Sequence, residues 1–238
     1  EKNMFKGNEI IVKTIVTTEL LSDIAAKFSL PCPDVLTGFK WIAELIRKNE
    51  GKVKYIAGGE ESYGYMIGDF VRDKDAISAC SMIAEATAWA KNNGRSLFDL
   101  LLDIYTEFGF YKEKLISVVR KGKSGSEEIQ AMMAGYRDNP PSTINNSKVI
   151  RIKDYQSSEN KDLVTGKVEH IDLPKSNVLQ FFTEDGSKIS VRPSGTEPKI
   201  KFYFGVKTEL QNRGEYHEKD RILEEKVNSI IEDMGLKG

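Results

Sequence analysis

Cysteine, histidine and long apolar runs are scarce in this sequence of 238 residues, and each scarcity excludes a class of protein. The two cysteines, Cys32 and Cys80, form neither a metal-binding spacing nor a disulfide framework, and both stand in apolar surroundings. We therefore expect reduced core thiols in a cytoplasmic protein. The two histidines, His170 and His217, are too far apart in sequence to propose as metal ligands. No apolar run approaches the roughly 18 residues of a membrane-spanning helix.

An excess of charge of one sign is also missing. The chain has 35 Lys and Arg against 36 Asp and Glu, a net charge of −1, so its bulk charge predicts neither a nucleic acid nor a membrane partner. Binding of an anion would have to come from local placement of basic residues. The chain begins "EKNMFKGNEIIV", without an initiator Met or a signal-peptide pattern. This beginning favours a processed protein or an excised fragment.

The first 120 residues alternate between strand and helix patterns, which is typical of an α/β layer domain. Asp73 or Asp75 is a natural N-cap for the third helix, Gly94 a C-cap, and Ser96 with Asp99 caps the fourth. The β-branched run 9–16 and the short apolar run ending at about Ala57 are predicted strands. The predicted helices, which have apolar residues at helical spacing, are 18–28, 38–49, 75–94 and 96–109.

The pattern changes after about residue 120. A polar stretch leads into a predicted helix beginning near Ser126, and the segment 138–147, with paired prolines, is a stronger break. A charged amphipathic helix is expected at 216–234, after strands at 148–155, 177–183, 188–193 and 199–206. This order predicts a small α+β domain with a mainly antiparallel sheet. We expect two domains, 1–122 and 123–238, which meet somewhere within 121–147.

The stretch "VRPSGTEPKIKFY" (191–203) gathers donors suited to a phosphate group. Arg192 offers a planar guanidinium, and Ser194 and Thr196 offer hydroxyls. Gly195 would let successive backbone N–H groups approach an anion. Lys201 adds positive charge on the following strand, on the same face as Lys199. An ordinary hairpin turn uses the same residue types, so the pattern alone leaves both readings open.

The stretch "GGEESYG" (58–64) follows a predicted strand, at the edge where open α/β sheets commonly bind ligands. Glu60 and Glu61 can accept hydrogen bonds from sugar hydroxyls, and Ser62 can both donate and accept. A solvated turn and a helix-capping Glu remain alternatives. An acid–base pair is the weaker third reading, because adjacent side chains usually point in different directions.

Two further basic segments have competing readings. Lys74, in "VRDKDA" (71–76), is either a surface lysine in a capped turn or a cation close to a ligand held by the first loop. The segment "GKSGS" (122–126) resembles a phosphate-binding P-loop. It fails the pattern because Ser117 stands where the first glycine belongs.

Taken together and in order, "GGEESYG", "RDKDA" and "RPSGTEPKIKFY" resemble the α-D-phosphohexomutase superfamily. Members of that family have four domains, with a sugar-recognition loop in the third and a phosphate-binding loop in the fourth. The opening "IVKTIVTTELL" (11–21) is also similar, so the resemblance covers nearly the whole chain as a C-terminal half. The form "GEES" is similar to the phosphoglucomutase type, since the phosphomannomutase/phosphoglucomutase type usually has "GEMSGH" and the glucosamine-phosphate mutase type "GEQSGH". The "GY" after the loop and "SGTEPKIKFY" look closest to the branch of phosphoglucomutase that also includes phosphopentomutases.

The resemblance implies interconversion of hexose 1-phosphate and hexose 6-phosphate through a bisphosphate intermediate. A phosphoserine and a Mg²⁺ ion, both in the N-terminal half of the enzyme, would carry the transfer. Glu60, Ser62 and Lys74 would bind the sugar. The non-reacting phosphate would be held by Arg192, Ser194, Gly195, Thr196 and Lys201. Hexose phosphates and the N-terminal half are the implied partners.

This sequence also departs from the family pattern. The serine loop of the form TASHNP and the metal loop of the form DGDxDR are absent, so we expect no catalytic residue and no metal site in this chain and no mutase activity from it alone. Lys201 stands where the family often has Arg, which predicts a looser phosphate contact. A stand-alone sugar-phosphate binding module, a phosphopentomutase and a purely structural domain remain alternatives.

Overall fold

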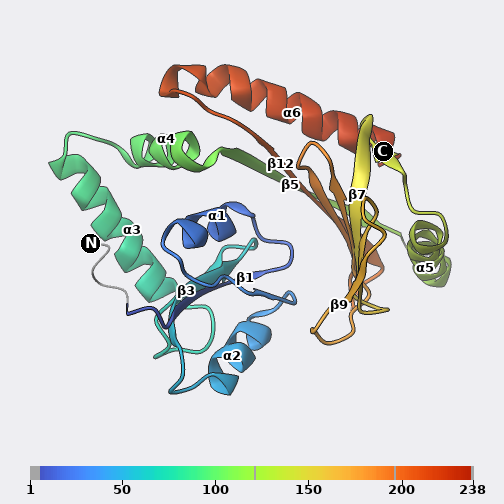
Figure 1. Cartoon of the computed structure of the whole chain (residues 1–238), viewed down its shortest axis with the longest axis horizontal. Helices are drawn as coiled ribbons and strands as arrows, with labels where there is room; N and C mark the ends of the chain where they lie inside the picture. Colours follow the sequence, from blue (N-terminus) through green and yellow to red (C-terminus); the bar gives the residue numbers. More distant parts are fainter. Residues whose placement is uncertain (1–5, 121, 196, 237–238) are drawn as a thin grey trace. The chain divides into compact units, whose positions relative to one another are not determined.

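The computed structural model describes residues 6–120, 122–195 and 197–236 (Figure 1). These residues form two compact units. Unit 1 comprises residues 1–110 and 209–216, and unit 2 comprises 111–208 and 217–238. The chain therefore leaves unit 1, builds most of unit 2 and returns for one short stretch. The domain limits 1–122 and 123–238 stay a prediction.

In the described part of unit 1, four strands form one mixed sheet in the order β2-β1-β3-β4. The central strand β1 (Glu9–Thr14) pairs in parallel with both β2 (Asp34–Val35) and β3 (Lys54–Glu60). The edge strand β4 (Gly64–Ile67) closes an antiparallel hairpin with β3. Our predicted strand ended at about Ala57, which is wrong: β3 continues through both glycines to Glu60, because β4 offers it a hydrogen-bonding partner.

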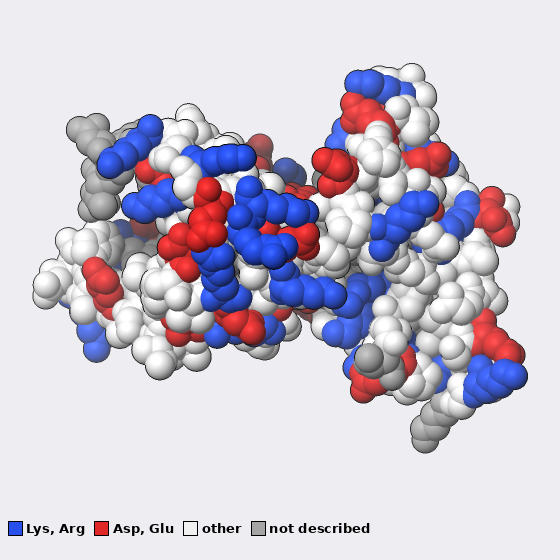
Figure 2. All heavy atoms as spheres, turned by 90° about the horizontal axis from the view of Figure 1, so that it is seen from below, with Lys and Arg blue, Asp and Glu red and all other residues white. Residues whose placement is uncertain are grey.

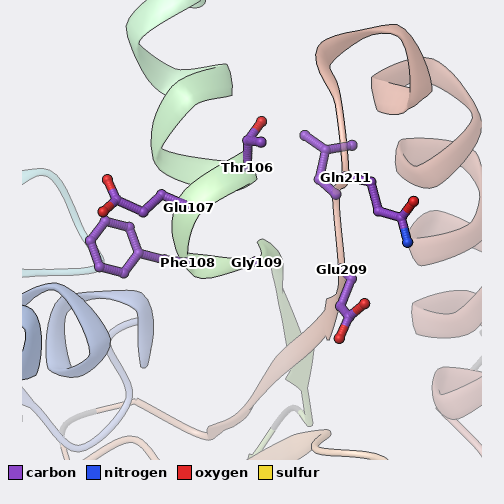
Figure 3. Close-up of a pocket in the computed structure, with 7 residues that line it drawn as sticks. Thr106, Glu107, Phe108, Gly109, Glu209 and Gln211 are labelled. Carbon is purple, nitrogen blue, oxygen red and sulfur yellow. The ribbon is translucent and has the colours of Figure 1, made fainter.

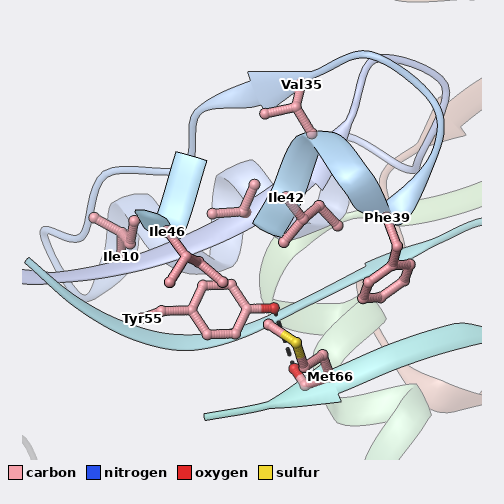
Figure 4. Packing of buried hydrophobic residues seen from close by; sticks show 8 residues of the cluster. Ile10, Val35, Phe39, Ile42, Ile46, Tyr55 and Met66 are labelled. Atoms are coloured by element: carbon pink, nitrogen blue, oxygen red, sulfur yellow. Dashed lines mark hydrogen bonds between the residues drawn. The ribbon is translucent and has the colours of Figure 1, made fainter. Parts of the chain in front are cut away.

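Two helices cover opposite faces of this sheet, α1 (Leu20–Lys27) and α2 (Phe39–Lys48) (Figure 1). Apolar side chains of α2 recur at helical spacing and pack on the sheet side chains of β1, β3 and β4 (Figure 4). The Tyr55 hydroxyl donates to the Met66 carbonyl at 3.2 Å, so its polar atom is satisfied inside the core. The buried cluster comprises Ile10, Val12, Val35, Phe39, Ile42, Ile46, Tyr55 and Met66.

The caps predicted for the next two helices, α3 (Ala76–Asn92) and α4 (Leu97–Phe108), are confirmed. Asp75 accepts hydrogen bonds from two backbone N–H groups of the first turn of α3. Gly94 follows the end of α3 with φ +66°, a left-handed conformation that favours glycine. Ser96 and Asp99 form a reciprocal capping box at the start of α4.

The sheet of unit 2 contains eight strands among the described residues, in the order β5-β12-β11-β10-β7-β8-β9, with β6 paired to β7. Each neighbouring pair from β12 to β9 is antiparallel, as is β6 with β7. The predicted fold class, an α/β domain followed by a domain with a mainly antiparallel sheet, is confirmed. The strands are β5 (Phe110–Val119), β6 (Thr143–Ile144), β7 (Ser147–Asp154), β8 (Glu159–Asp162), β9 (Val168–His170), β10 (Leu179–Thr183), β11 (Lys188–Pro193) and β12 (Lys199–Thr208).

Two helices complete unit 2. The helix α5 (Gly122–Asp138) begins before the predicted Ser126, and α6 (Tyr216–Asp233) follows a 3-10 turn, η2 (Arg213–Glu215). Arg137 on α5 reaches Asp154 and Asn177, which ties the helix to the sheet. The buried side chains of α6 are Leu223, Val227, Ile230 and Ile231, as its apolar spacing predicted.

Surface properties agree only partly with expectation. Cys80 is exposed on α3 and Cys32 is half-buried, so the prediction of core thiols is wrong for Cys80. The reason is that α3 buries Ala90 alone among its residues.

Basic and acidic side chains are interspersed on the face drawn in Figure 2. Within the described residues, no helix has the length and apolar character needed to span a membrane.

Candidate sugar and phosphate loops

The β3–β4 hairpin places Glu60 at the carboxyl edge of the unit 1 sheet. Because β1 and β3 are parallel, their last residues, Lys13 to Thr14 and Gly59 to Glu60, lie side by side at this edge. From here β1 leads to β2 on one side, whereas β3 leads to β4 on the other. A point where neighbouring strands diverge in this way is where open α/β sheets bind ligands.

Glu60 is held by two partners. Its Oε1 accepts a hydrogen bond from the backbone N–H of Gly38 at 2.6 Å, and its Oε2 lies 3.1 Å from Nζ of Lys74. The Glu60 side chain is only 8% exposed, whereas that of Lys74 is 48% exposed. The structure therefore brings together two of the predicted sugar-binding residues. Of the two side chains, Lys74 faces solvent, whereas the carboxylate of Glu60 is mostly covered.

Glycines are required around Glu60 because neighbouring atoms leave no room for a Cβ. A Cβ on Gly58 would collide with the Val12 carbonyl oxygen and lie 2.6 Å from the Tyr55 hydroxyl. A Cβ on Gly59 would lie 2.7 Å from the Tyr65 ring. The glycines of "GGEESYG" thus serve close packing of the hairpin, which the sequence pattern alone did not distinguish from a flexible turn.

The turn between the strands carries the remaining predicted sugar contact. Ser62 is exposed there, one residue before Tyr63, whose φ of +62° is left-handed. Glu61 points back toward β1, where the Thr14 hydroxyl lies 3.5 Å from its Oε2. Glu60 and Glu61 therefore have different partners, which argues against a shared acid–base role.

Sequence reasoning missed a buried lysine at the same edge. Lys13 is 1% exposed, and its Nζ lies 2.6 Å from Asp34 Oδ1 and 3.0 Å from Glu19 Oε1. Burial lowers the pKa of Lys13, but attraction to Asp34 and Glu19 outweighs it and leaves the pKa raised. A charged residue inside the β-branched run 9–16 was the available signal, since a buried charge needs a partner.

The second loop joins β11 to β12 in unit 2. Arg192 on β11 and Lys201 on β12 are directly paired across the two antiparallel strands, and both are half-buried. Along β12, Lys199 and Lys201 alternate with the buried Ile200 and Phe202, so the two lysines share a face as predicted. The loop therefore begins and ends with a basic residue.

Backbone hydrogen bonds shape the loop itself. The Ser194 N–H donates to the Lys199 carbonyl at 2.8 Å, and the Arg120 N–H donates to the Pro198 carbonyl at 2.9 Å. Gly195 is exposed, and no atom lies within 4 Å of the position a Cβ would take. The protein itself therefore does not require glycine there. Thr196 lies outside the described residues, and Lys199 forms an ion pair with Glu197.

One cavity of unit 1, about 350 Å³ in volume, lies away from these loops (Figure 3). It is formed where the end of α4 meets residues 209–211, and Glu107 in its wall pairs with Lys27. None of the predicted binding residues lines it. The lining residues are Thr106, Glu107, Phe108, Gly109, Glu209, Leu210 and Gln211.

Acidic side chains are spread out rather than gathered as metal ligands would be. Among residues 6–120, 122–195 and 197–236, no group of three or more His, Cys, Asp or Glu side chains is placed to hold a metal ion. Asp34 and Glu19, which lie close to one another, already share the ammonium of Lys13. This part of the chain does not fit a Mg²⁺ ion.

The fold and the two loops together define a class: an α/β unit with an acidic hairpin at the carboxyl edge of its sheet, followed by an antiparallel unit with a loop flanked by basic residues. The family model of the phosphoglucomutase/phosphomannomutase α/β/α domain III matches residues 1–108, and that of the C-terminal domain matches residues 123–218. The chain belongs to the phosphoglucomutase/phosphomannomutase family and corresponds to its third and C-terminal domains.

Related proteins agree with this assignment. The phosphoglucomutase of Staphylococcus haemolyticus is 38% identical over 84% of this chain, and that of Staphylococcus epidermidis is 39% identical over 84%. The alignments span 36% of the length of each of these relatives. Among solved structures, the open form of the Paramecium parafusin phosphoglucomutase matches 95% of this chain and 38% of its own, with a TM-score of 0.62 and 19% identity. That likeness concerns the fold alone.

Proposed function

We propose that this chain is the sugar- and phosphate-binding part of a phosphoglucomutase that interconverts hexose 1-phosphate and hexose 6-phosphate. The observation that carries the proposal is the Glu60–Lys74 pair at the carboxyl edge of the unit 1 sheet. It puts a hydrogen-bond acceptor and an open cation where a hydroxyl-rich anion would be bound. Family membership supports the same conclusion.

Each loop has a distinct task in this proposal. Glu60, Ser62 and Lys74 bind the sugar, with Ser62 and Lys74 presenting their polar atoms to solvent. In the second loop, Arg192 and Lys201 supply charge, while Ser194, Gly195 and Thr196 supply donors for the non-reacting phosphate. Positioning of this kind is a large part of phosphoryl-transfer catalysis.

The chemistry itself would come from the rest of the enzyme. In this proposal a phosphoserine and a Mg²⁺ ion lie in the part of the enzyme that this chain does not cover, and hexose 1,6-bisphosphate is the expected intermediate. The described residues do not fit Mg²⁺, so the part of this chain in the reaction would be binding and positioning. The N-terminal part of the same enzyme is therefore the proposed partner, in the cytoplasm.

Two measurements test the proposal. Calorimetric titration of the chain with glucose 6-phosphate is expected to give saturable heat, and mixing glucose 1-phosphate with the chain alone is expected to give no glucose 6-phosphate. Co-expression with a polypeptide carrying the serine and metal loops should restore turnover. Binding without restored turnover would favour a stand-alone sugar-phosphate module, and no saturable heat would favour a structural domain.

The second candidate is a phosphopentomutase, since the "GY" after the first loop and "SGTEPKIKFY" resemble a branch that includes both enzymes. Titration with ribose 5-phosphate beside glucose 6-phosphate separates the two. Tighter binding of the pentose phosphate would overturn the hexose assignment and retain the site.

A further inference from the structure

The side chain of Lys74 reaches Glu60 by passing directly over Gly64. A Cβ built on Gly64 would lie 2.5 Å from Cε of Lys74, 2.8 Å from Cδ and 2.9 Å from Cγ. Real Cβ atoms do not approach carbon this closely, so the lysine stem occupies the space that any other residue at position 64 would fill. The ammonium then lies 3.1 Å from Glu60 Oε2 and 5.9 Å from the centre of the Phe39 ring.

Backbone conformation does not explain this glycine. Gly64 is not among the glycines with positive φ, and it pairs with Glu60 in the regular register of the β3–β4 hairpin. An alanine could therefore adopt the same backbone angles without strain. What an alanine could not do is leave the lysine stem where it is. The neighbour it would strike is a flexible side chain, so the lysine would move and the hairpin would remain.

We propose that Gly64 is a positioning residue, which fixes the Lys74 ammonium at the sugar loop by leaving a channel for the lysine stem. The inference rests on the proposed function in that Lys74 contacts the bound hexose phosphate. Glu60 binds the ammonium of Lys74 at the end of this channel. Its carboxylate is fixed because its other oxygen accepts a hydrogen bond from the Gly38 N–H at the start of α2. Ligand specificity at this edge of the sheet then depends on Gly64, because a side chain there would displace Lys74.

The test compares Gly64→Ala with wild type in two measurements. The first is the rate at which acetic anhydride acetylates Lys74, followed by peptide mass spectrometry, which needs no ligand. Loss of the ion pair exposes the amine, so we expect acetylation several-fold faster in Gly64→Ala. The second is glucose 6-phosphate affinity by calorimetry, expected to fall about tenfold, the lower end of the effect of losing a charged hydrogen bond.

Two variants serve as controls. Gly135→Ala changes an exposed helical glycine with no atom within 4 Å of its Cβ position, and it should alter neither measurement. In a Lys74→Ala background no stem remains to be displaced, so Gly64→Ala should cause no further loss of affinity. If Gly64→Ala alone fails to fold, the double variant with Lys74→Ala should fold, and its failure to do so would overturn the proposal.

The outcomes separate the positioning role from the function on which it rests. Unchanged Lys74 acetylation in Gly64→Ala overturns the role of Gly64, whatever the ligand does. Faster acetylation with no glucose 6-phosphate binding by wild type retains the positioning role and overturns the proposed function. If Gly64→Ala costs the same affinity with and without the Lys74→Ala change, Gly64 acts on the turn instead and the proposal is overturned.

Discussion

Lys13 Nζ lies 2.6 Å from Asp34 Oδ1, and the two residues are paired partners on the neighbouring parallel strands β1 and β2. The lysine is almost completely buried, while the Asp34 side chain keeps 30% of its surface in contact with solvent. The pair therefore fixes the register of the short strand β2 in the unit 1 sheet. It also keeps a buried cation paired beside Gly59, which leads into the candidate sugar loop.

Lys13→Met should lower the free energy of unfolding by about 3 kcal/mol at pH 7, the low end for breaking a buried ion pair, because both carboxylates retain some solvent. The pKa of Lys13 is raised in the folded state. Its contribution to the free energy of unfolding is therefore complete below the pKa of the unfolded state, and is lost as the pH rises through the pKa of the folded state. Urea titrations from about pH 7 to about pH 11.5, which spans the usual lysine pKa, should show the two proteins converging at the alkaline end. The exposed Lys52→Met is the matched control, and an equal loss there would contradict the prediction.

In contrast to Lys13, Glu224 should stabilise the fold at neutral pH and lose this contribution as the pH becomes acidic. Hydrogen bonds from Lys114 and Lys112, at 2.7 and 3.0 Å, lower the pKa of Glu224 to about 2. Its contribution is therefore present above the unfolded pKa and is lost as pH falls through the folded one. Glu224→Gln should lower the thermal midpoint at about pH 6 and have a much smaller effect near pH 2, where the folded-state carboxyl is about half protonated. The same change at the exposed Glu218 should leave the midpoint unchanged at both pH values, and a parallel shift for both variants would argue against the lysine contacts.

Arg192→Ala should weaken glucose 6-phosphate binding by about 1.5–3 kcal/mol, the range for a charge-assisted hydrogen bond. Lys201, its cross-strand neighbour, would remain and keep part of the attraction. Calorimetry at low salt measures the change, with Arg221→Ala on the exposed face of α6 as the control for net charge. Unchanged affinity would remove Arg192 from the phosphate site.

Gly58→Ala should destabilise unit 1 by about 1–3 kcal/mol, the usual cost of inserting an extra methyl group into a packed core. The added Cβ meets the backbone oxygen of Val12, which cannot move aside as a lysine stem can. Chemical denaturation measures the loss. Gly135→Ala, in an open helical position, should stabilise slightly because alanine restricts the unfolded chain. A neutral Gly58→Ala would mean that β1 and β3 can separate at little cost.

The sequence predicted the helices of this protein better than its edge strands. Apolar spacing and capping residues such as Asp75 and Ser96 are local signals, and both helices they begin were found. Strand β4 was not predicted because it is a strand only through its pairing with β3, and its four residues carry no local signal of that pairing. Strands β8 and β9 were missed because their residues are mostly polar and none of them is buried.

The residues of the candidate site were also easier to predict from the sequence than their contacts. Glu60, Lys74, Arg192 and Lys201 could be named from motifs, because their charge and spacing are visible in the sequence. The contacts around them could not: the Gly38 N–H that binds Glu60 is a backbone group, and the buried Lys13 pairs with Asp34, which is distant along the chain. Contacts that depend on tertiary packing become visible only when the sheet edge is assembled.

The return of residues 209–216 to unit 1 has a consequence for how this part of the protein can be cut or exchanged. Arg213 pairs with Asp103, and the Tyr216 ring stacks on Phe110 and meets the edge of Phe98. A gene fragment that stops at residue 110 would encode a unit in which Asp103 keeps Arg95 as a partner but loses Arg213, and in which two aromatic rings lose the Tyr216 ring that covers them. Recombination between relatives at a single crossover would split unit 1 between two parents. Intact exchange of unit 1 would need two separated segments to move together.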